Sequence, residues 1–183
     1  FRSYPIMTST ELSEANQESA NQLRISYIGN LGLNRWKSIV DVGTCLKQLG
    51  YVLDVYSAEK RTSIISHLNP KNGIQFHGFI SSSEVKRVIK ESTVVLHVEA
   101  MDPTNSDRVR YSMSTKIGES LGSGVCLLAY GPEDVSSIEY LRENKAACVV
   151  TKKEQLLGVL KELLDDEKLR AKYIDNALKL AST

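Results

Sequence analysis

Residues 109–132 read VRYSMSTKIGESLGSGVCLLAYGP, and this stretch decides both the fold class and the place to look for a site. The apolar run at 125–129 indicates a buried strand, and the glycines just before it indicate a tight turn. Residues 115–122 have the pattern of a short helix that begins at a group of hydroxyl side chains and a lysine. A helix N-terminus carries unpaired backbone N–H groups and partial positive charge, so it favours phosphate.

One acidic residue, Glu119, lies about one turn into this predicted helix. Its carboxylate can accept hydrogen bonds from sugar hydroxyls. Hydroxyl side chains also cap helices that bind nothing, so Ser114, Thr115 and Lys116 have a purely structural interpretation as well. The combination of hydroxyls, lysine and glutamate predicts a nucleotide-sugar site.

Outward from this stretch, short apolar runs alternate with helical patterns. The runs lie at 23–28, 52–56, 74–77, 94–98, 125–129 and 147–150, and the helical patterns at 36–49, 59–68, 84–90, 115–122, 134–142, 154–164 and 168–180. Most runs are continuously apolar, which is typical of strands covered on both faces. The chain is therefore expected to form a six-stranded, mainly parallel sheet in a Rossmann-like three-layer α/β sandwich. Residues 8–22 are polar, and 1–22 are expected to be a linker or a remnant of a preceding domain, with one domain over 23–183.

The composition excludes several classes of function. The 183 residues are the length of one domain, and a net charge of +1 gives no general attraction for nucleic acid or anionic membranes. No apolar run approaches the ~20 residues that span a bilayer. The three cysteines have no metal-ligand spacing, and two lie in apolar runs, so we expect buried thiols and a reducing, cytoplasmic compartment. The chain begins at Phe1, and we expect it to be a fragment of a longer protein.

Ligands of open α/β sheets bind beyond the carboxyl ends of the strands, so the loops at these ends are the candidates for a binding site. Residues 27–37, at the first of these ends, read YIGNLGLNRWK. Gly29 permits close backbone approach, and Arg35 at the start of the next helix offers a bidentate guanidinium for phosphate. An ordinary strand-to-helix turn with a basic first turn explains the same pattern, so both interpretations stay open.

Two further loops hold candidates. At 76–79 the sequence reads FHGF, where Gly78 would let a flat ring approach the backbone and Phe79 would border it; His77 is interpreted as a core or edge histidine. The segment 99–114 is expected to lack regular structure and so to be functional or mobile. Glu99 directly follows a buried strand, where a ligand-facing carboxylate would lie. Asp102 and Asp107, by contrast, are expected to be solvated.

Taken together, these segments resemble the C-terminal, donor-binding domain of GT-B fold glycosyltransferases, of the retaining group 1 type of bacterial cell-surface polysaccharide assembly. Residues 27–31 look like the Tyr-Val-Gly-Arg-Leu opening of that family, and residues 74–79 look like its hydrophobic-x-Phe-x-Gly strand end. Residues 114–129 resemble the family segment from Thr-Lys through Glu-x-Leu-Ala-x-Gly-x-Pro-Val-Leu-Ala. The resemblance covers 23–180 and is most specific around Glu119.

The resemblance implies roles for several residues. Glu119 matches the glutamate that binds the ribose hydroxyls of the donor, and Arg35 falls near the diphosphate-binding lysine. Ser114, Thr115 and Lys116 fall where the chain meets the diphosphate and the sugar.

The chain also departs from the family pattern. Asn30 stands where the family has an arginine, so one diphosphate contact is missing or replaced. Tyr111 stands eight residues before Glu119, at the position of the first of two glutamates, and Glu99 is a candidate substitute for that glutamate. Val125 replaces a proline, which we interpret as structural.

The predicted function is the donor-binding half of a glycosyltransferase that moves a sugar from a nucleoside diphosphate, of the UDP or GDP type, to a glycan or lipid-linked acceptor. No cofactor besides this substrate, no metal and no nucleic-acid partner is expected, and no catalytic residue is assigned. The partner would be an N-terminal acceptor domain, which could reach a membrane-associated acceptor at the inner face of the membrane. The chain is expected to be inactive without that domain. A nucleotide-sugar epimerase or hydrolase with the same fold and a non-catalytic α/β binding module remain open as alternatives.

Overall fold

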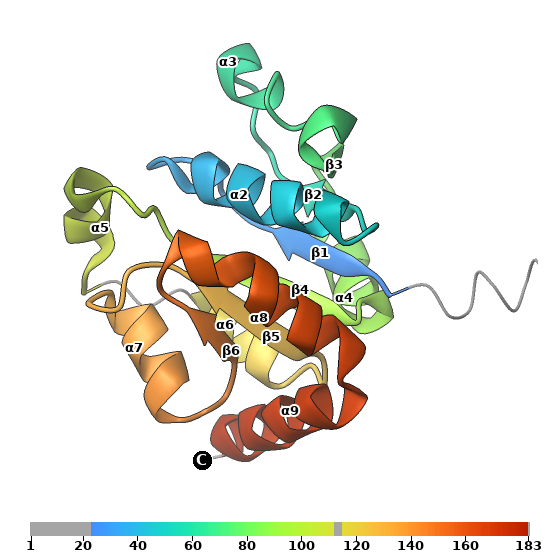
Figure 1. Cartoon of the computed structure of the whole chain (residues 1–183), viewed down its shortest axis with the longest axis vertical. Helices are drawn as coiled ribbons and strands as arrows, with labels where there is room; N and C mark the ends of the chain where they lie inside the picture. The colour runs from blue at the N-terminus through green and yellow to red at the C-terminus, as the bar shows by residue number, and fades with distance from the viewer. Residues whose placement is uncertain (1–22, 112–114, 183) are drawn as a thin grey trace, which may run out of the picture.

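The structure, a computed structural model, describes residues 23–111 and 115–182, with the backbone alone for Thr115 and Lys116. Its strands form one sheet with helices on both faces (Figure 1). The strands are β1 Ile25–Ile28, β2 Leu53–Tyr56, β3 Ile74–Gly78, β4 Val94–Val98, β5 Cys126–Tyr130 and β6 Cys148–Val150. Their order is β3-β2-β1-β4-β5-β6 and every pairing is parallel, so the predicted six-stranded Rossmann-like sheet is confirmed.

The helices cover the sheet in two layers. Their bounds are α2 Arg35–Gln48, α3 Thr62–Ile65, α4 Ser82–Glu91, α5 Pro103–Val109, α6 Thr115–Leu121, α7 Ser136–Glu143, α8 Lys153–Asp165 and α9 Glu167–Ala181, with a 3-10 turn at Pro70–Asn72. Helices α2 and α8 lie against each other over one face, whereas α4, α6 and α7 cover the other (Figure 1). Helix α9 packs along β5 beside α6 and α8.

The alternation along β5 shows why the apolar runs are continuous. Leu127 and Ala129 belong to the cluster under α6 and α7, whereas Cys126, Leu128 and Tyr130 belong to the cluster under α2 and α8. All five are at most 2% exposed. Successive strand residues point to opposite faces, and both faces are buried here, so no position is left for a polar residue. Cys126 and Cys148 are buried free thiols, as predicted.

The prediction that 99–114 lacks regular structure is wrong, because α5 forms within it. The Asp102 carboxylate accepts a hydrogen bond from the backbone N–H of Asn105 at 3.1 Å and caps the helix. Pro103 occupies the first turn, where a missing N–H costs nothing. Asp102 is half-buried rather than solvated, since its other carboxylate oxygen accepts a hydrogen bond from Asn34 Nδ2 at 3.1 Å. The Asp-Pro pair was the overlooked helix signal.

The helical pattern over 59–68 is also shorter than expected and gives only the single turn of α3. The Glu59 carboxylate accepts hydrogen bonds from the backbone N–H groups of Lys60 and Arg61 and from the Arg61 guanidinium. These bonds fix a turn where the helix was expected to begin. At the other end, Pro70 starts a 3-10 turn that Gly73 closes with a left-handed φ of 70°.

Candidate functional site

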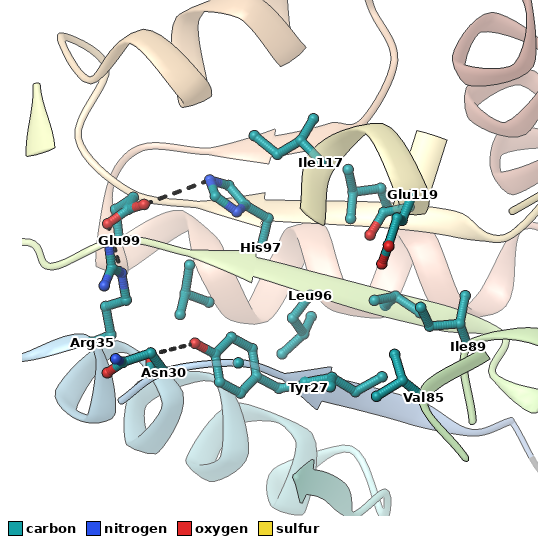
Figure 2. Close-up of a pocket in the computed structure, with 16 residues that line it drawn as sticks. Tyr27, Asn30, Arg35, Val85, Ile89, Leu96, His97, Glu99, Ile117 and Glu119 are labelled. Atoms are coloured by element: carbon teal, nitrogen blue, oxygen red, sulfur yellow. Dashed lines mark hydrogen bonds and ion pairs between the residues drawn. The ribbon is translucent and has the colours of Figure 1, made fainter. Parts of the chain in front are cut away.

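A pocket of about 200 Å³ lies at the junction of β1 and β4. The strand order reverses between these two strands, which is where open α/β sheets bind ligands. Polar side chains from the loop after β1, from α2, from the end of β4 and from α6 line the pocket: Asn30, Arg35, His97, Glu99, Glu119 and Ser120. Figure 2 shows Arg35 and Glu99 at one end of this pocket, and Glu119 with the apolar side chains of α4 at the other. The described part of the chain thus gathers five of the predicted site residues (Gly29, Asn30, Arg35, Glu99 and Glu119) around one cavity.

The loop after β1 forms one wall of the pocket. The Tyr27 hydroxyl donates a hydrogen bond to the backbone oxygen of Asn30 at 2.7 Å, and the Gly29 N–H donates to the Tyr56 carbonyl at 3.1 Å. A Cβ on Gly29 would lie 2.7 Å from the Tyr27 hydroxyl oxygen, so a larger residue would displace that ring. The Asn30 side chain accepts a hydrogen bond from the Gly32 N–H at 2.6 Å and thereby shapes the turn.

Two residues with a left-handed backbone conformation precede α2 and direct its first residue toward the pocket. Leu33 and Asn34 have φ values of 53° and 62° immediately before Arg35, the first residue of the helix. A left-handed backbone is strained for a bulky side chain such as Leu33, at roughly 1–3 kcal/mol. The hydrogen bond between Asn34 and Asp102 ties this turn to the segment after β4. The turn before α2 is therefore strained, and it places Arg35 at the carboxyl end of the sheet.

Glu99 is paired with that arginine. Its Oε2 accepts a hydrogen bond from Arg35 Nε at 2.8 Å, and the residue is only 5% exposed. Its backbone is fixed as well, because its carbonyl accepts a hydrogen bond from Ser38 Oγ at 2.7 Å and its N–H donates to the Tyr130 carbonyl at 2.9 Å. Burial raises the pKa of Glu99, and the hydrogen bond and charge of Arg35 oppose that rise.

His97 extends this polar set and was missed by sequence reasoning. Its Nε2 lies 3.0 Å from Ser137 Oγ and 3.8 Å from Glu99 Oε1. Burial, assisted by the positive charge of Arg35, lowers the pKa of His97 to about 4, so the ring is neutral at neutral pH. The overlooked signal was spacing, since residues two apart on a strand share a face and Glu99 was already a candidate.

Glu119 projects from α6 into the other end of the pocket (Figure 2). It is exposed, and it makes no hydrogen bond or ion pair with the side chains that the structure describes. Ile117 and Leu121 are 4% exposed and form the packed side of the helix, as the sequence indicated. Ser114 lies outside the described residues, and Thr115 and Lys116 are placed only as backbone at the start of α6, so their predicted roles stay predictions.

A second hollow of about 450 Å³ adjoins the first and shares the β1 loop with it. Phe79 lines this hollow and is 76% exposed. Gly78 precedes it with a left-handed φ of 75°, and a Cβ there would touch nothing within 4 Å. Backbone conformation rather than crowding therefore explains the glycine. His77 is an edge histidine, as predicted, since it stacks on Tyr56 with ring centroids 4.5 Å apart and its Nε2 lies 2.6 Å from an Asp54 carboxylate oxygen.

Other kinds of site find no support in the described ranges. Tyr111 is 87% exposed and does not line either hollow. Within 23–111 and 115–182, no three histidine, cysteine, aspartate or glutamate side chains gather as a metal site would require. Over the same ranges, no helix is long and apolar enough to cross a bilayer.

One protein family matches most of the chain. The sequence profile of the family described as glycosyl transferase-like matches residues 12–182. No curated protein sequence matches.

Several solved structures share the fold. HepE (Alr3699) of Anabaena in complex with UDP-glucose has a TM-score of 0.69 at 16% identity, over 96% of this chain and 49% of that one. WaaG, a glycosyltransferase involved in lipopolysaccharide biosynthesis, has a TM-score of 0.68 at 16% identity, over 98% of this chain and 48% of its own. The C-terminal domain of the group 1 glycosyl transferase LpcC from Francisella tularensis has a TM-score of 0.66 at 17% identity, over 91% and 88% of the two chains. The chain thus spans about half the length of HepE and WaaG.

Proposed function

The chain belongs to the glycosyl transferase-like family, and we propose that it is the donor-binding half of a GT-B enzyme that transfers a sugar from a nucleoside diphosphate to a glycan or lipid-linked acceptor. One observation carries the proposal: Arg35 and Glu119 reach into one pocket from different elements at the junction of β1 and β4. The first suits a diphosphate and the second suits sugar hydroxyls. The donor is of the UDP or GDP type, and no cofactor besides it is proposed.

Arg35 is the proposed diphosphate ligand. Glu99 engages its Nε, and no other hydrogen bond of this guanidinium is formed within the described residues, so its two terminal nitrogens are left for phosphate oxygens. The backbone at the start of α6 and the charge of Lys116 complete this proposed seat. During transfer the bond from sugar to phosphate breaks, and negative charge grows on the departing diphosphate. Cations and N–H groups that are already in place stabilise that charge without reorganising.

The remaining parts of the donor fit the rest of the two hollows. Glu119 would accept hydrogen bonds from the ribose hydroxyls, because it is exposed inside the pocket. The adjoining hollow is bordered by Phe79, an exposed aromatic ring on which a nucleobase can stack. Asn30 and Gly29 lie between the two hollows and would approach the donor with backbone and amide groups.

The acceptor is assigned to a second domain. The chain covers about half of HepE and WaaG. The resemblance to GT-B enzymes implies that an N-terminal domain holds the acceptor, and we propose such a domain for this protein. We place the whole enzyme in bacterial polysaccharide biosynthesis, in the cytoplasm or at the inner face of the membrane, with a membrane-associated acceptor. WaaG, which shares the fold and is involved in lipopolysaccharide biosynthesis, supports that proposal.

Titration of the chain with UDP-glucose and GDP-mannose, followed by NMR, tests the proposal. We expect saturable binding of one of these donors in the micromolar-to-millimolar range, and weakened binding for Glu119→Gln. Glu162→Gln is the matched control, because Glu162 is exposed on α8 over the opposite face of the sheet. The donor site would be refuted if neither nucleotide sugar bound to this chain or to the full-length protein.

A further inference from the structure

A buried carboxylate beside a phosphate-binding arginine calls for an explanation. Negative charge at Glu99 opposes the approach of an anion, so the pair lowers the attraction that Arg35 alone would exert. Within the described residues, the Glu99 carboxylate contacts Arg35 and His97 and caps no helix. Its carboxylate therefore acts on pocket residues rather than on a helix end.

The geometry of the ion pair indicates what the carboxylate does. Arg35 donates through Nε, which is the inner nitrogen of the guanidinium, and neither outer nitrogen makes a hydrogen bond within the described residues. Both residues line the pocket, but the side chain of Arg35 is 20% exposed and that of Glu99 is 6% exposed, so the arginine is the more accessible of the two. A Cβ on Gly131 would lie 3.0 Å from Glu99 Cβ, which shows how closely the chain packs behind the glutamate.

We propose that Glu99 is a positioning residue, which holds the Arg35 guanidinium toward the pocket and takes up a proton from solvent when an anionic diphosphate binds there. The inference rests on the proposed donor site and deepens it. Binding of the diphosphate supplies a new partner for Arg35 and a repulsive neighbour for Glu99. Protonation removes the repulsion, while the neutral carboxyl still accepts the hydrogen bond from Nε.

The described side chains around Glu99 keep the same charge between about pH 5 and pH 8, so a change in this range can be attributed to Glu99. Among the side chains that the structure describes, the titratable groups that face it are Arg35 from α2, His97 from β4 and Tyr27 from β1, while α7 contributes the uncharged Ser137. Burial raises the pKa of Tyr27 and lowers that of His97 to about 4, so both side chains are neutral between about pH 5 and pH 8.

The sign of the effect follows from linkage. Burial already raises the pKa of Glu99, and a bound anion raises it further. The complex then holds more protons than the unliganded chain, so affinity increases as the pH falls. Nucleotide sugars are suitable probes because their diphosphate is esterified at both ends and does not itself titrate near neutral pH.

The test compares two substitutions at one position. Glu99→Gln removes the charge but keeps an acceptor for Arg35, whereas Glu99→Ala removes both. We expect the dissociation constant of UDP-glucose or GDP-mannose to fall at least about twofold for the wild type from pH 8 to pH 5. Glu99→Gln is expected to bind about three to ten times more tightly than the wild type at pH 8 and to show no pH slope. Glu99→Ala should bind more weakly than Glu99→Gln.

Two controls keep the outcomes separate. Glu91→Gln makes the same change in another ion pair, that of Arg24 with Glu91. This pair is about half exposed and lies at the amino end of β1, so the variant should keep the wild-type dependence of affinity on pH. Glu119→Gln should keep the slope too, although it weakens binding. A slope that survives Glu99→Gln, or disappears in Glu119→Gln, overturns the inference and leaves the donor site standing.

The affinity at pH 8 provides a further check. Weaker binding by Glu99→Gln than by the wild type also overturns the inference. If the wild type binds neither probe, the proposed function itself fails. If near-UV circular dichroism shows that Glu99→Ala is unfolded, Glu99→Gln decides alone.

Discussion

At the end of the pocket nearest the carboxyl end of β4, Arg35, Glu99 and His97 form one connected set of side chains, whereas Glu119 at the α6 end is exposed and touches none of them. The first end is held in place by the protein itself, through an ion pair whose glutamate is buried. The second end is open to receive its hydrogen bonds from a ligand. Substitutions at the first end should therefore change both stability and binding, and substitutions at the second should change binding alone.

Loss of the arginine is expected to have the largest effect. Arg35→Ala removes the proposed diphosphate contact and should weaken UDP-glucose or GDP-mannose binding by about 30-fold or more. It also leaves the buried carboxylate of Glu99 without its cation, so the free energy of unfolding should fall by about 1–3 kcal/mol at pH 8. Chemical denaturation and ligand titration measure the two effects. Adding Glu99→Gln to Arg35→Ala should restore most of the stability and none of the binding; restored binding would contradict the assignment.

The histidine at the same end makes the fold sensitive to acid. His97 has a pKa of about 4 in the folded chain against about 6.5 when unfolded, so between these values the unfolded state binds more protons and is favoured as the pH falls. The raised pKa of Glu99 acts in the opposite direction, and comparison with His97→Asn separates the two. The wild type should lose about 2–3 kcal/mol relative to this variant from pH 7 to pH 4, measured by urea unfolding. Parallel curves for the two proteins would show that the ring is not held neutral.

The glutamate at the open end provides the sharpest contrast. Glu119→Ala should weaken nucleotide-sugar binding about tenfold, since it removes hydrogen bonds to an ionised acceptor. Its unfolding free energy should stay within about 0.5 kcal/mol of the wild type, because the side chain is exposed. A destabilisation similar to that of Arg35→Ala would remove the distinction between the two ends.

The smallest effect is expected beside the pocket, at Phe79. Phe79→Ala should weaken binding about threefold through lost base stacking, without a change in melting temperature, because the ring is 76% exposed. Val52→Ala is the matched control, an exposed apolar side chain at the amino end of β2 that is 55% exposed. Equal affinities for Phe79→Ala, Val52→Ala and the wild type would remove the aromatic ring from the site.

The sheet was predictable from sequence because both of its faces are buried. Leu127 and Leu128 point to opposite faces and are both apolar, and such runs mark each strand to within two residues. The helix α5 was not predicted, because a single capping aspartate and a proline decide it against a polar sequence without an apolar face. Local hydrogen bonds of this kind leave no periodicity to detect.

The site was predictable where a residue lies next to a strand end. Glu99 and Gly29 follow β4 and β1 directly, so topology alone brings them to one edge of the sheet. What the sequence could not indicate is that Glu99 faces an arginine rather than a ligand, since that contact joins residues 64 positions apart. For His97 the spacing of two residues from Glu99 indicates a shared face, but a histidine within an apolar run gives no signal that its ring contacts Ser137.

A crystal structure of the chain with UDP-glucose or GDP-mannose tests the central claim most directly, since the claim is that the two ends of one pocket hold two parts of one donor. We predict diphosphate oxygens within about 3 Å of the outer nitrogens of Arg35, and ribose hydroxyls at hydrogen-bond distance from the Glu119 carboxylate. A nucleotide sugar bound away from the junction of β1 and β4, or one whose phosphates leave Arg35 without a contact, would contradict it.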